Sequence, residues 1–591
     1  MEFINLRDAI KSTALLKKKD NKNFQEIKIA FLRNYTVEKI IPYLELFFLK
    51  EGYLPKFYFS EYDNIFQDVL NENSEYYKFA PDLTILAMTT SVVSEKLTYD
   101  FVKTIQEDLK TEMHRIISQV KEIVSLLSKK KVGTILVHNF ETPKFPALGI
   151  LDYQSKKYQV NSFRKLNLEL TEVCEKYKEA HIIDIDFLQR FLGTEEANDR
   201  RYWHVEKNPY GQKFLQCIAE DYLKFTKALK GRLRKCLILD LDNTLVGGIL
   251  GEDGFDGIKI GKTYPGSAFT NFQRSILNLY NRGIILGICS KNNIEDVTEV
   301  LDKHPDMVLR SKHFSIIKAN WQDKATNITN ISKELNIGQD SLVFVDDNPF
   351  EINLVKTKLP DVKVIQLPKD PTSYADIIDS LGVFDSLSYS SEDKKRTKMY
   401  QEEVKRKNFK ENFTNLDDYL STLAMELEIK KNDPFSSPRI AQLCQRTNQF
   451  NLTSKRYTEG EIKSYIEDKS VDVFSVRLKD KFGDMGIIGA AIVKYESEKA
   501  IIDSFLLSCR SLGRGVENAF LRYCLDEIKK RGCKFVNSYY FKTKKNKQVE
   551  KFFDERGFQL LENKDGLEKK FIFNSLKHSL VESPKYFNIS I

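Results

Sequence analysis

The fold is decided by residues 237–244, which read Leu-Ile-Leu-Asp-Leu-Asp-Asn-Thr. The apolar run, which begins at Cys236, predicts a buried parallel strand that ends in two carboxylates, Asp240 and Asp242. In α/β sheets, ligands bind beyond the carboxyl ends of the strands, so both acids should lie at the mouth of a site. Carboxylates this close repel each other unless a cation lies between them, and Mg²⁺ suits carboxylate and phosphate oxygens. The stretch therefore predicts metal-assisted phosphoryl transfer, with one acid as nucleophile and the other as acid and base.

Three further stretches carry residues suited to the same chemistry. The segment Ile-Cys-Ser-Lys-Asn contains Ser290, Trp-Gln-Asp-Lys closes on Lys324, and a second apolar strand leads into Asp346 and Asp347. With the first stretch, they resemble motifs I to IV of the haloacid dehalogenase (HAD) phosphatase superfamily, in that order. The resemblance implies that Ser290 and Lys324 bind phosphate and that Asp346 and Asp347 help to hold Mg²⁺. One motif alone would be weak support, whereas four in order form a strong signal.

A closer resemblance covers nearly the whole chain. Residues 240–254 read Asp-Leu-Asp-Asn-Thr-Leu-Val-Gly-Gly-Ile-Leu-Gly-Glu-Asp-Gly, and residues 439–453 read Arg-Ile-Ala-Gln-Leu-Cys-Gln-Arg-Thr-Asn-Gln-Phe-Asn-Leu-Thr. With Cys-Ser-Lys-Asn-Asn (289–293) and Asp-Asp-Asn-Pro (346–349) between them, they resemble the FkbH-like family. Its members are linked to loading a glyceryl group, derived from 1,3-bisphosphoglycerate, onto an acyl carrier protein. The resemblance thus implies a phosphorylated three-carbon acyl donor and a carrier protein as partners.

The HAD resemblance assigns a role to each acid. Asp240 would attack phosphorus, and Asp242 would protonate the leaving oxygen and then deprotonate water. The predicted phosphate-binding residues are Thr244, Ser290 and Lys324, and the predicted metal ligands are Asp240, Asp242 (through its main-chain carbonyl), Asp346 and Asp347. An aspartate after a strand can also cap a helix. Capping could explain one of these acids, but it does not explain all four together.

Cys289 has two interpretations. A thiolate that attacks an acyl phosphate at its carbonyl carbon gives a thioester and free phosphate. Beside Mg²⁺ and Lys324 the pKa of this thiol could be lowered, and the family resemblance makes this cysteine a candidate glyceryl acceptor. The other interpretation is a small buried residue that closes a core strand. With the family resemblance, the catalytic role is favoured.

The motif spacing leaves no room for a large cap domain. Asp240 and Ser290 are 50 residues apart, and Ser290 and Lys324 are 34 apart. Glycines crowd the stretch from Gly247 to Gly261, where HAD proteins carry a short helical turn and a β-hairpin flap. We therefore expect an open site, which suits a substrate or acceptor carried by another protein, unless the flanking domains cover it.

Residues 1–230 alternate predicted strands and helices, which implies a doubly wound sheet. The layout resembles the SGNH-hydrolase-like domain that precedes the phosphatase in the FkbH-like family. Where that fold carries Gly-Asp-Ser, residues 32–36 read Leu-Arg-Asn-Tyr-Thr, so the nucleophilic serine is missing. We expect a structural or partner-binding module. A hydrolase that uses Thr36, with Asn139 and the pair Asp199 and His204 as later blocks, is the alternative.

The remaining chain divides into the HAD core (231–385), a charged helical linker (386–425) and a third domain (426–591). In this domain Arg-Ser-Leu-Gly-Arg-Gly (510–515) lies between a predicted strand and a helix, which resembles the pyrophosphate loop of GNAT acyltransferases. Free main-chain N–H groups at a helix N-terminus bind phosphate. The residues expected to hold a carrier's phosphopantetheine are Arg510, Gly513, Arg514 and Gly515. The alternative is a docking platform with an empty groove.

The fold class expected is therefore α/β in three domains: an SGNH- or flavodoxin-like doubly wound domain, a HAD Rossmann-like core with a minimal cap, and a GNAT-like α+β domain. The net charge of +8 is spread over 92 basic and 84 acidic residues, which gives no argument for nucleic acid. No run of 18 apolar residues and no signal peptide is found, so no membrane contact is expected. Eight scattered cysteines without a Cys-x-x-Cys pair fit a cytoplasmic protein.

The expected function is an Mg²⁺-dependent enzyme that dephosphorylates 1,3-bisphosphoglycerate or a related acyl phosphate. The acyl group would pass to an acyl carrier protein and feed a polyketide, peptide or surface-glycan pathway. Two alternatives remain open: a stand-alone phosphatase that acts on a small phosphate ester, and a scaffold that binds a carrier protein.

Overall fold

The computed structural model describes residues 3–19, 24–130, 132–387, 389, 391–410, 412–508, 511–543, 545–575 and 582–590. The chain forms two compact units, residues 1–226 and 227–591. The second unit contains two sheets, so the described chain builds three sheets in all. The predicted α/β class is confirmed, with two parallel sheets and one mixed sheet.

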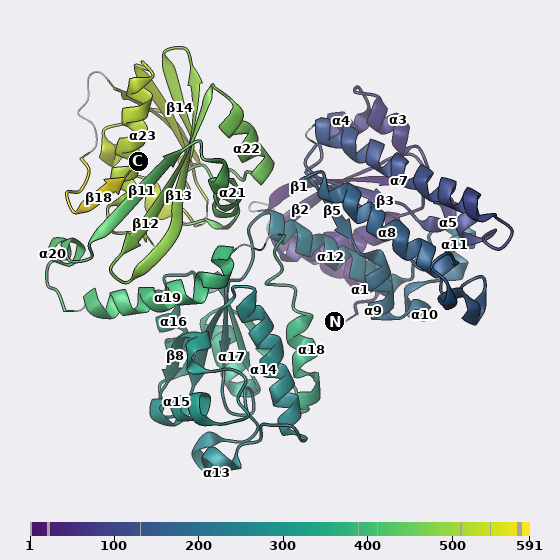
Figure 1. Cartoon of the computed structure of the whole chain (residues 1–591), viewed down its shortest axis with the longest axis horizontal. Helices are drawn as coiled ribbons and strands as arrows, with labels where there is room; N and C mark the ends of the chain where they lie inside the picture. Colours follow the sequence, from purple (N-terminus) through teal and green to yellow (C-terminus); the bar gives the residue numbers. More distant parts are fainter. Residues whose placement is uncertain are drawn as a thin grey trace. The chain divides into compact units, whose positions relative to one another are not determined.

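The first unit is built on a five-stranded parallel sheet with the order β2-β1-β3-β4-β5. Its strands are β1 (Gln25–Arg33), β2 (Tyr53–Phe59), β3 (Leu83–Ala87), β4 (Thr134–His138) and β5 (Ala180–Ile183). Its helices are α1 (Leu6–Lys19), α2 (Ile41–Lys50), α3 (Ile65–Leu70), α4 (Glu75–Phe79), α5 (Thr90–Val93), α6 (Glu95–Thr98), α7 (Gln106–Lys129), α8 (Gln159–Glu175), α9 (Ile185–Leu192), α10 (Thr194–Ala197), α11 (Arg200–Glu206) and α12 (Gln212–Leu229). Helices α7 and α8 lie side by side over one face (Figure 1) and bury their apolar residues against it. The doubly wound order is the one predicted for this part of the chain.

The predicted phosphatase core, which we call the phosphatase core below, is a second parallel sheet with the order β10-β9-β6-β7-β8. Its elements are β6 (Cys236–Leu239), α13 (Leu250–Gly257), α14 (Gly266–Asn281), β7 (Ile285–Ser290), α15 (Ile294–Lys303), β8 (Phe314–Ala319), α16 (Lys324–Leu335), β9 (Leu342–Asp346), α17 (Pro349–Lys358), β10 (Lys363–Gln366) and α18 (Tyr374–Asp379). Strand β6 is buried on both faces: Leu237 and Leu239 pack into one apolar cluster, and Cys236 and Ile238 into another. This is why its sequence is continuously apolar.

The C-terminal sheet is mixed and has the order β16-β17-β15-β14-β13-β12-β11-β18. Its elements are α20 (Leu416–Ser421), β11 (Met425–Lys431), α21 (Ser437–Arg446), α22 (Glu459–Glu467), β12 (Val471–Asp480), β13 (Gly483–Glu496), β14 (Lys499–Leu507), α23 (Val516–Lys530), β15 (Phe535–Phe541), β16 (Gln559–Lys564), β17 (Glu568–Asn574) and β18 (Phe587–Ser590). Strands β14 and β15 are parallel and are joined through α23. Helix and sheet bury one apolar cluster between them, which gives the predicted α+β layout.

Helix α19 (Ser391–Lys410) occupies the segment predicted as a linker. It is packed rather than free: Met399, Tyr400 and Arg406 are buried. Its Gln401 donates two hydrogen bonds to main-chain carbonyls at the start of β8, and its Arg406 pairs with Asp480 at the end of β12. The helix therefore ties the phosphatase core to the C-terminal sheet.

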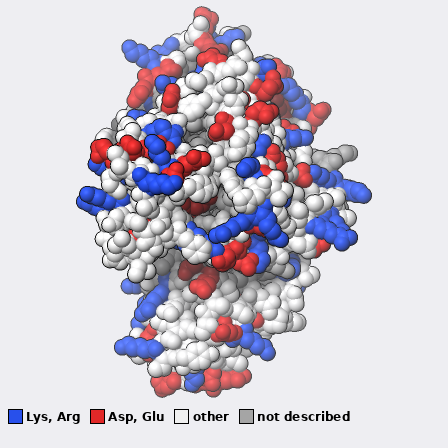
Figure 2. All heavy atoms as spheres, turned by 90° about the vertical axis from the view of Figure 1, so that its right-hand side faces the viewer, with Lys and Arg blue, Asp and Glu red and all other residues white. Residues whose placement is uncertain are grey.

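The surface carries both signs of charge. On the face drawn in Figure 2, Lys and Arg side chains are interspersed with Asp and Glu. Within the described ranges, no helix has the length and apolar character needed to cross a membrane.

Candidate active site at the phosphatase sheet

Asp240 and Asp346 meet at the carboxyl edge of the sheet. Asp240 directly follows β6, Asp346 closes the neighbouring β9, and both side chains are buried. Lys324, the first residue of α16, places its Nζ 2.9 Å from Asp240 Oδ1 and 2.6 Å from Asp346 Oδ2. Burial opposes the charge on Lys324, but the two carboxylates outweigh it and raise the pKa of its ammonium. The predicted nucleophile, phosphate-binding lysine and one predicted metal ligand thus form one cluster.

A metal ion fits this cluster. Asp240, Asp346 and Asp347 each offer a carboxylate oxygen, and these oxygens all lie within 4.8 Å of one another. Burial, followed by the charge of Asp240, raises the pKa of both Asp346 and Asp347 above the ordinary aspartate value. Such crowded acids are stabilised when a cation lies between them, and three hard oxygens suit Mg²⁺. These residues would hold the ion.

Asp242 stands apart from that oxygen cluster. Its Oδ1 accepts a hydrogen bond of 2.9 Å from the main-chain N–H of Leu250, and its Oδ2 accepts one of 2.8 Å from Asn292 Nδ2. Burial raises the pKa of this carboxyl. A fixed carboxyl with a raised pKa suits a proton donor, which is the role predicted for Asp242.

Asn292 is a site residue that the motif analysis missed. Its Nδ2 also donates to Ser290 Oγ at 2.9 Å, so one amide joins the predicted phosphate-binding hydroxyl to the predicted acid. Its place two residues after Ser290, in the loop after β7, was the available signal. The Thr244 hydroxyl is fully buried and makes no hydrogen bond within the described ranges. The structure therefore leaves the predicted role of Thr244 untested.

A short flap follows the first motif, as the glycine-rich stretch predicted. Gly247 and Lys259 exchange two main-chain hydrogen bonds, and the loop between them carries α13. Gly248 has φ 93°, which favours glycine, and its N–H donates to Asn243 Oδ1 at 2.9 Å. The N–H of Leu250 holds this flap to Asp242, so the flap also fixes the predicted acid.

The contacts of Cys289 favour the second interpretation, a small buried residue of a core strand. Its side chain is fully buried in the apolar cluster that also contains Ile238. Burial dominates over the charge of Lys324 and raises the thiol pKa to about 12. The cysteine closes a core strand, as the second interpretation held, because the face of β7 that carries it is covered by α16 and α17.

The glycine loop before α23 does not present its arginine to a ligand. Arg514 is buried, and its Nη2 lies 2.6 Å from Glu403 Oε2 of α19. Gly515 is covered, since a Cβ there would come within 2.8 Å of atoms of Pro584 and Tyr586. Gly513 is open, since no described atom lies within 4 Å of a Cβ placed there, and Arg510 lies outside the described residues. The contacts of Arg514 and Gly515 favour a structural role, and phosphate binding by this loop stays a prediction.

The gap between β14 and β15 is filled by the chain itself. The two strands pair only from Lys499 to Ile502 of β14. Beyond this point the Phe450 carbonyl accepts from the Leu507 N–H at 3.0 Å, and the Leu452 N–H donates to the Phe505 carbonyl at 3.2 Å. The Leu452 carbonyl accepts from the Phe541 N–H of β15 at 2.9 Å. Residues 447–453 are thus an irregular segment, with one isolated bridge between Asn451 and Leu506, that fills the gap between the described parts of β14 and β15.

The described hydrogen bonds and ion pairs of the alternative hydrolase residues of the first unit do not join these residues to one another. Asp199 accepts the Arg201 N–H at the start of α11 and pairs with the Arg201 side chain. His204 is exposed on α11, and Asn139 Nδ2 donates to Asp184 Oδ1 at 2.7 Å. Thr36 is half-buried after β1. These contacts favour the structural or partner-binding interpretation.

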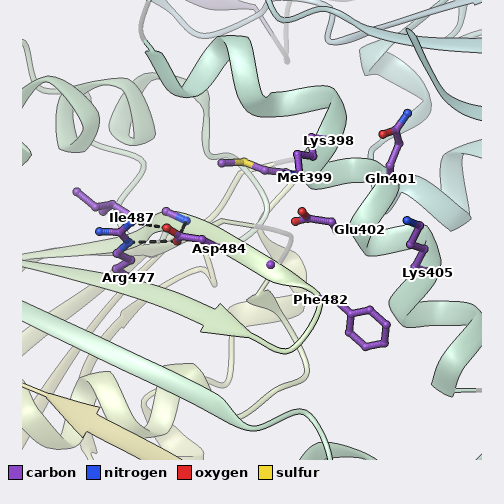
Figure 3. Close-up of a pocket in the computed structure, with 11 residues that line it drawn as sticks. Lys398, Met399, Gln401, Glu402, Lys405, Arg477, Phe482, Asp484 and Ile487 are labelled. Carbon is purple, nitrogen blue, oxygen red and sulfur yellow. Dashed lines mark hydrogen bonds and ion pairs between the residues drawn. The ribbon is translucent and has the colours of Figure 1, made fainter. Parts of the chain in front are cut away.

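A cavity of about 720 Å³ lies between α19 and the β12–β13 hairpin (Figure 3). Glu402 points towards its centre, and Arg477 and Asp484 are paired on one side, with Nε and Oδ1 3.1 Å apart. Gly483 leaves room for the Glu402 carboxylate, because a Cβ on residue 483 would come within 2.4 Å of Glu402 Cδ. No residue of the phosphatase cluster is among the described residues that line this cavity.

Comparisons with known proteins agree with this arrangement. Residues 49–226 match the family model "FkbH, N-terminal domain", and residues 235–363 match "NLI interacting factor-like phosphatase". The N-terminal part of the protein BF1531 from Bacteroides fragilis, which contains a phosphatase domain and was crystallised with Mg, is 29% identical, with a TM-score of 0.60. The match covers 66% of this chain and 100% of that one. A comparison with curated proteins gives no match.

Solved acetyltransferases also match about a quarter of the chain. The ribosomal-protein-S18-alanine N-acetyltransferase of Escherichia coli is 18% identical, with a TM-score of 0.20, over 25% of this chain and 90% of that one. The PaiA N-acetyltransferase of Thermoplasma acidophilum, solved with coenzyme A, is 18% identical, with a TM-score of 0.19, over 25% of this chain and 98% of that one. The two family models match the chain in the predicted order, with the N-terminal domain before the phosphatase domain. Residues 49–226 thus resemble an FkbH N-terminal domain, and residues 235–363, which follow them, resemble the phosphatase domain of an enzyme.

Proposed function

We propose that the enzyme dephosphorylates a phosphorylated three-carbon acyl donor, such as 1,3-bisphosphoglycerate, and that the acyl group passes to the phosphopantetheine thiol of an acyl carrier protein. The observation that carries the proposal is the convergence of Asp240, Lys324 and Asp346 at one strand edge. The open spacing of the motifs supports an acceptor that arrives on another protein.

For phosphoryl transfer, an Asp240 oxygen attacks phosphorus and the bond to the leaving oxygen breaks. Asp242, which the Leu250 N–H and Asn292 hold in place, gives its proton to that oxygen. Asp242 then takes a proton from water, which displaces phosphate from Asp240. Lys324 holds a phosphoryl oxygen as charge develops on it. Mg²⁺ bound by Asp240, Asp346 and Asp347 would neutralise part of the same charge.

For acyl transfer, the carrier thiol must attack the carbonyl carbon instead. The new bond joins sulfur to carbon, the bond from that carbon to the phosphate oxygen breaks, and phosphate leaves with both bonding electrons. With 1,3-bisphosphoglycerate this step leaves a 3-phosphoglyceryl thioester on the carrier, and phosphoryl transfer to Asp240 then removes the 3-phosphate. The thiol proton passes to a base, for which Asp242 is placed. Because Cys289 is buried with a raised pKa, we propose direct transfer to the carrier without an enzyme-bound thioester.

The test is the mass of the carrier. Purified enzyme, Mg²⁺, 1,3-bisphosphoglycerate and a holo carrier protein are incubated together, and the carrier is weighed by mass spectrometry. We expect phosphate to be released and the carrier to gain a 3-phosphoglyceryl group, which becomes a glyceryl group when the 3-phosphate is removed. Asp240→Asn and the apo carrier, which lacks the phosphopantetheine thiol, serve as controls.

A stand-alone phosphatase is the second candidate. The burial of Cys289 and the self-filled gap between β14 and β15 favour it, since neither offers an acyl acceptor. In the same assay this candidate predicts released phosphate with a carrier of unchanged mass. A scaffold without catalysis would release no phosphate above the level of Asp240→Asn.

A further inference from the structure

A salt bridge crosses the end of the strand that carries Asp240. Lys291 follows β7, Glu351 lies in the first turn of α17 after β9, and β6 runs between these two strands. Lys291 Nζ and Glu351 Oε1 are 2.6 Å apart. The pair therefore bridges the edge of the sheet where the phosphoryl group of a substrate would meet Asp240.

The salt bridge and Asp240 lie on the same side of the sheet. Side chains alternate along strands, and Ile238 and Cys289 both face the apolar cluster under α16 and α17. Asp240 lies two residues after Ile238 and Lys291 two residues after Cys289, so their side chains face the same side of the sheet. The pKa of the Cys289 thiol, which both Asp240 and Glu351 raise, agrees with this placement.

The two partners differ in exposure. Glu351 is 4% exposed, and its Oε2 makes no hydrogen bond in the described part of the chain. The Lys291 side chain is 40% exposed. Burying a carboxylate costs free energy unless a cation pairs with it, so Glu351 holds the Lys291 ammonium in place. The ammonium has three N–H donors, and Glu351 Oε1 accepts from one of them. Lys291 is thus a positioned cation at the mouth of the site.

We propose that Lys291 binds a second anionic group of the substrate, and that Glu351 is the residue that positions it. This inference rests on the proposed function and defines its substrate class: a small phosphorylated acid with a second phosphate or a carboxylate. A neutral phosphate ester would make no use of this cation. The site would therefore bind substrates with two anionic groups more tightly than substrates with one.

The test compares two acyl phosphates on the full-length enzyme with Mg²⁺. One is 1,3-bisphosphoglycerate, which has a second phosphate, and the other is acetyl phosphate, which has none. Losing a charge-assisted hydrogen bond should raise the KM of Lys291→Met for 1,3-bisphosphoglycerate about 10- to 100-fold, with little change in kcat. The KM for acetyl phosphate should change at least five times less. Lys291→Arg should restore most of the affinity.

Lys303→Met is the matched control, because Lys303 also forms a lysine–glutamate pair but lies exposed at the far end of α15. It should leave both KM values unchanged. Equal changes for the two substrates in Lys291→Met, or none, would overturn the inference.

If 1,3-bisphosphoglycerate is not hydrolysed at all, the proposed function fails, and Lys291 is tested through inhibition of acetyl phosphate hydrolysis. Lys291→Met should then weaken inhibition by 3-phosphoglycerate, whose second anion is a carboxylate, more than inhibition by glycerol 3-phosphate, and equal weakening would overturn the inference.

Discussion

Two aspartates that are two residues apart have different surroundings. Asp240 faces a lysine at 2.9 Å, whereas Asp242 accepts two hydrogen bonds from neutral donors and has a raised pKa. Asp240 thus lies beside a cation, whereas burial raises the pKa of Asp242, which suits an acid that can hold a proton. The division of roles follows from these neighbours rather than from the residue type.

Replacing the acid should slow catalysis without abolishing substrate binding. For Asp242→Asn we expect kcat to fall by about 10²- to 10⁴-fold, the usual contribution of a general acid and base. Steady-state phosphate release in Mg²⁺ measures the effect. An activated substrate with a good leaving group, such as acetyl phosphate, should lose less than a sugar phosphate. Equal losses on both would argue against proton donation by Asp242.

Mg²⁺ affinity should depend on pH through Asp346. Burial and then Asp240 raise its pKa from 3.8 to about 7, so the folded protein binds this proton more tightly than the unfolded chain does. The metal-free protein therefore loses this stabilisation as the pH rises from 3.8 to about 7. Mg²⁺ must displace the same proton, so its affinity should rise with pH up to about 7, by at most about tenfold per unit, and then level off. Calorimetric titration at several pH values measures it, and a flat profile would contradict the assignment.

The sequence alone could place the acids at the ends of strands, but it could not predict the surroundings of Arg514 and Cys289. Strand-ending carboxylates form a local pattern, so Asp240 and Asp346 could be placed from hydrophobic runs. Arg514 could not, because the glutamate it pairs with lies 111 residues earlier in the chain. The same holds for Cys289, whose raised pKa depends on the two helices that cover β7. Burial set by distant segments has no signature within a motif.

At the scale of elements, the irregular segment 447–453 lies between the ends of β14 and β15 that do not pair with each other, and it limits what the C-terminal sheet can bind. Phe450 and Leu452 pack into the main apolar cluster of that sheet, while their backbone uses the free edges of both strands. The predicted order of strands and helix was right here. The sequence did not predict that residues 447–453 fill this gap, because the segment is short and irregular.

The segment that fills this gap should be part of the folded core. Phe450→Ala removes a buried ring that packs edge-to-face on Phe552, so we expect a loss of about 3–5 kcal/mol in the free energy of unfolding. Chemical denaturation followed by fluorescence measures it. Phe435→Ala, at a ring that is 94% exposed, is the control and should change stability by less than about 0.5 kcal/mol.

The same segment predicts that the C-terminal sheet does not bind coenzyme A. With the Phe505 carbonyl and the Leu507 N–H already bonded, and with Arg514 paired, we expect no binding in calorimetry at millimolar coenzyme A. Binding in the micromolar range would show that residues 450–452 leave the gap in solution.

At the scale of the whole molecule, a buried ionic network joins α19 to the C-terminal sheet. Arg406 makes two hydrogen bonds to Asp480, of 2.6 and 2.7 Å, and Arg514 pairs with both Asp480 and Glu403. The opposite side of α19 is bonded to the start of β8 through Gln401. A helix expected to be a charged linker is therefore a structural joint, and its stability rests on charges that are shielded from water.

Breaking this joint should uncouple the C-terminal sheet from the phosphatase core. Arg406→Met leaves Asp480 buried without its bidentate partner, which should cost about 3–5 kcal/mol. In differential scanning calorimetry we expect the C-terminal transition to move to lower temperature and to separate from that of the phosphatase core. Arg477→Met, which breaks the half-exposed pair with Asp484, should cost less than about 1 kcal/mol. The double variant Arg406→Met with Asp480→Leu removes the unpaired charge and should recover part of the loss. If Arg406→Met were no more destabilising than Arg477→Met, the network would not be what holds α19 to the sheet.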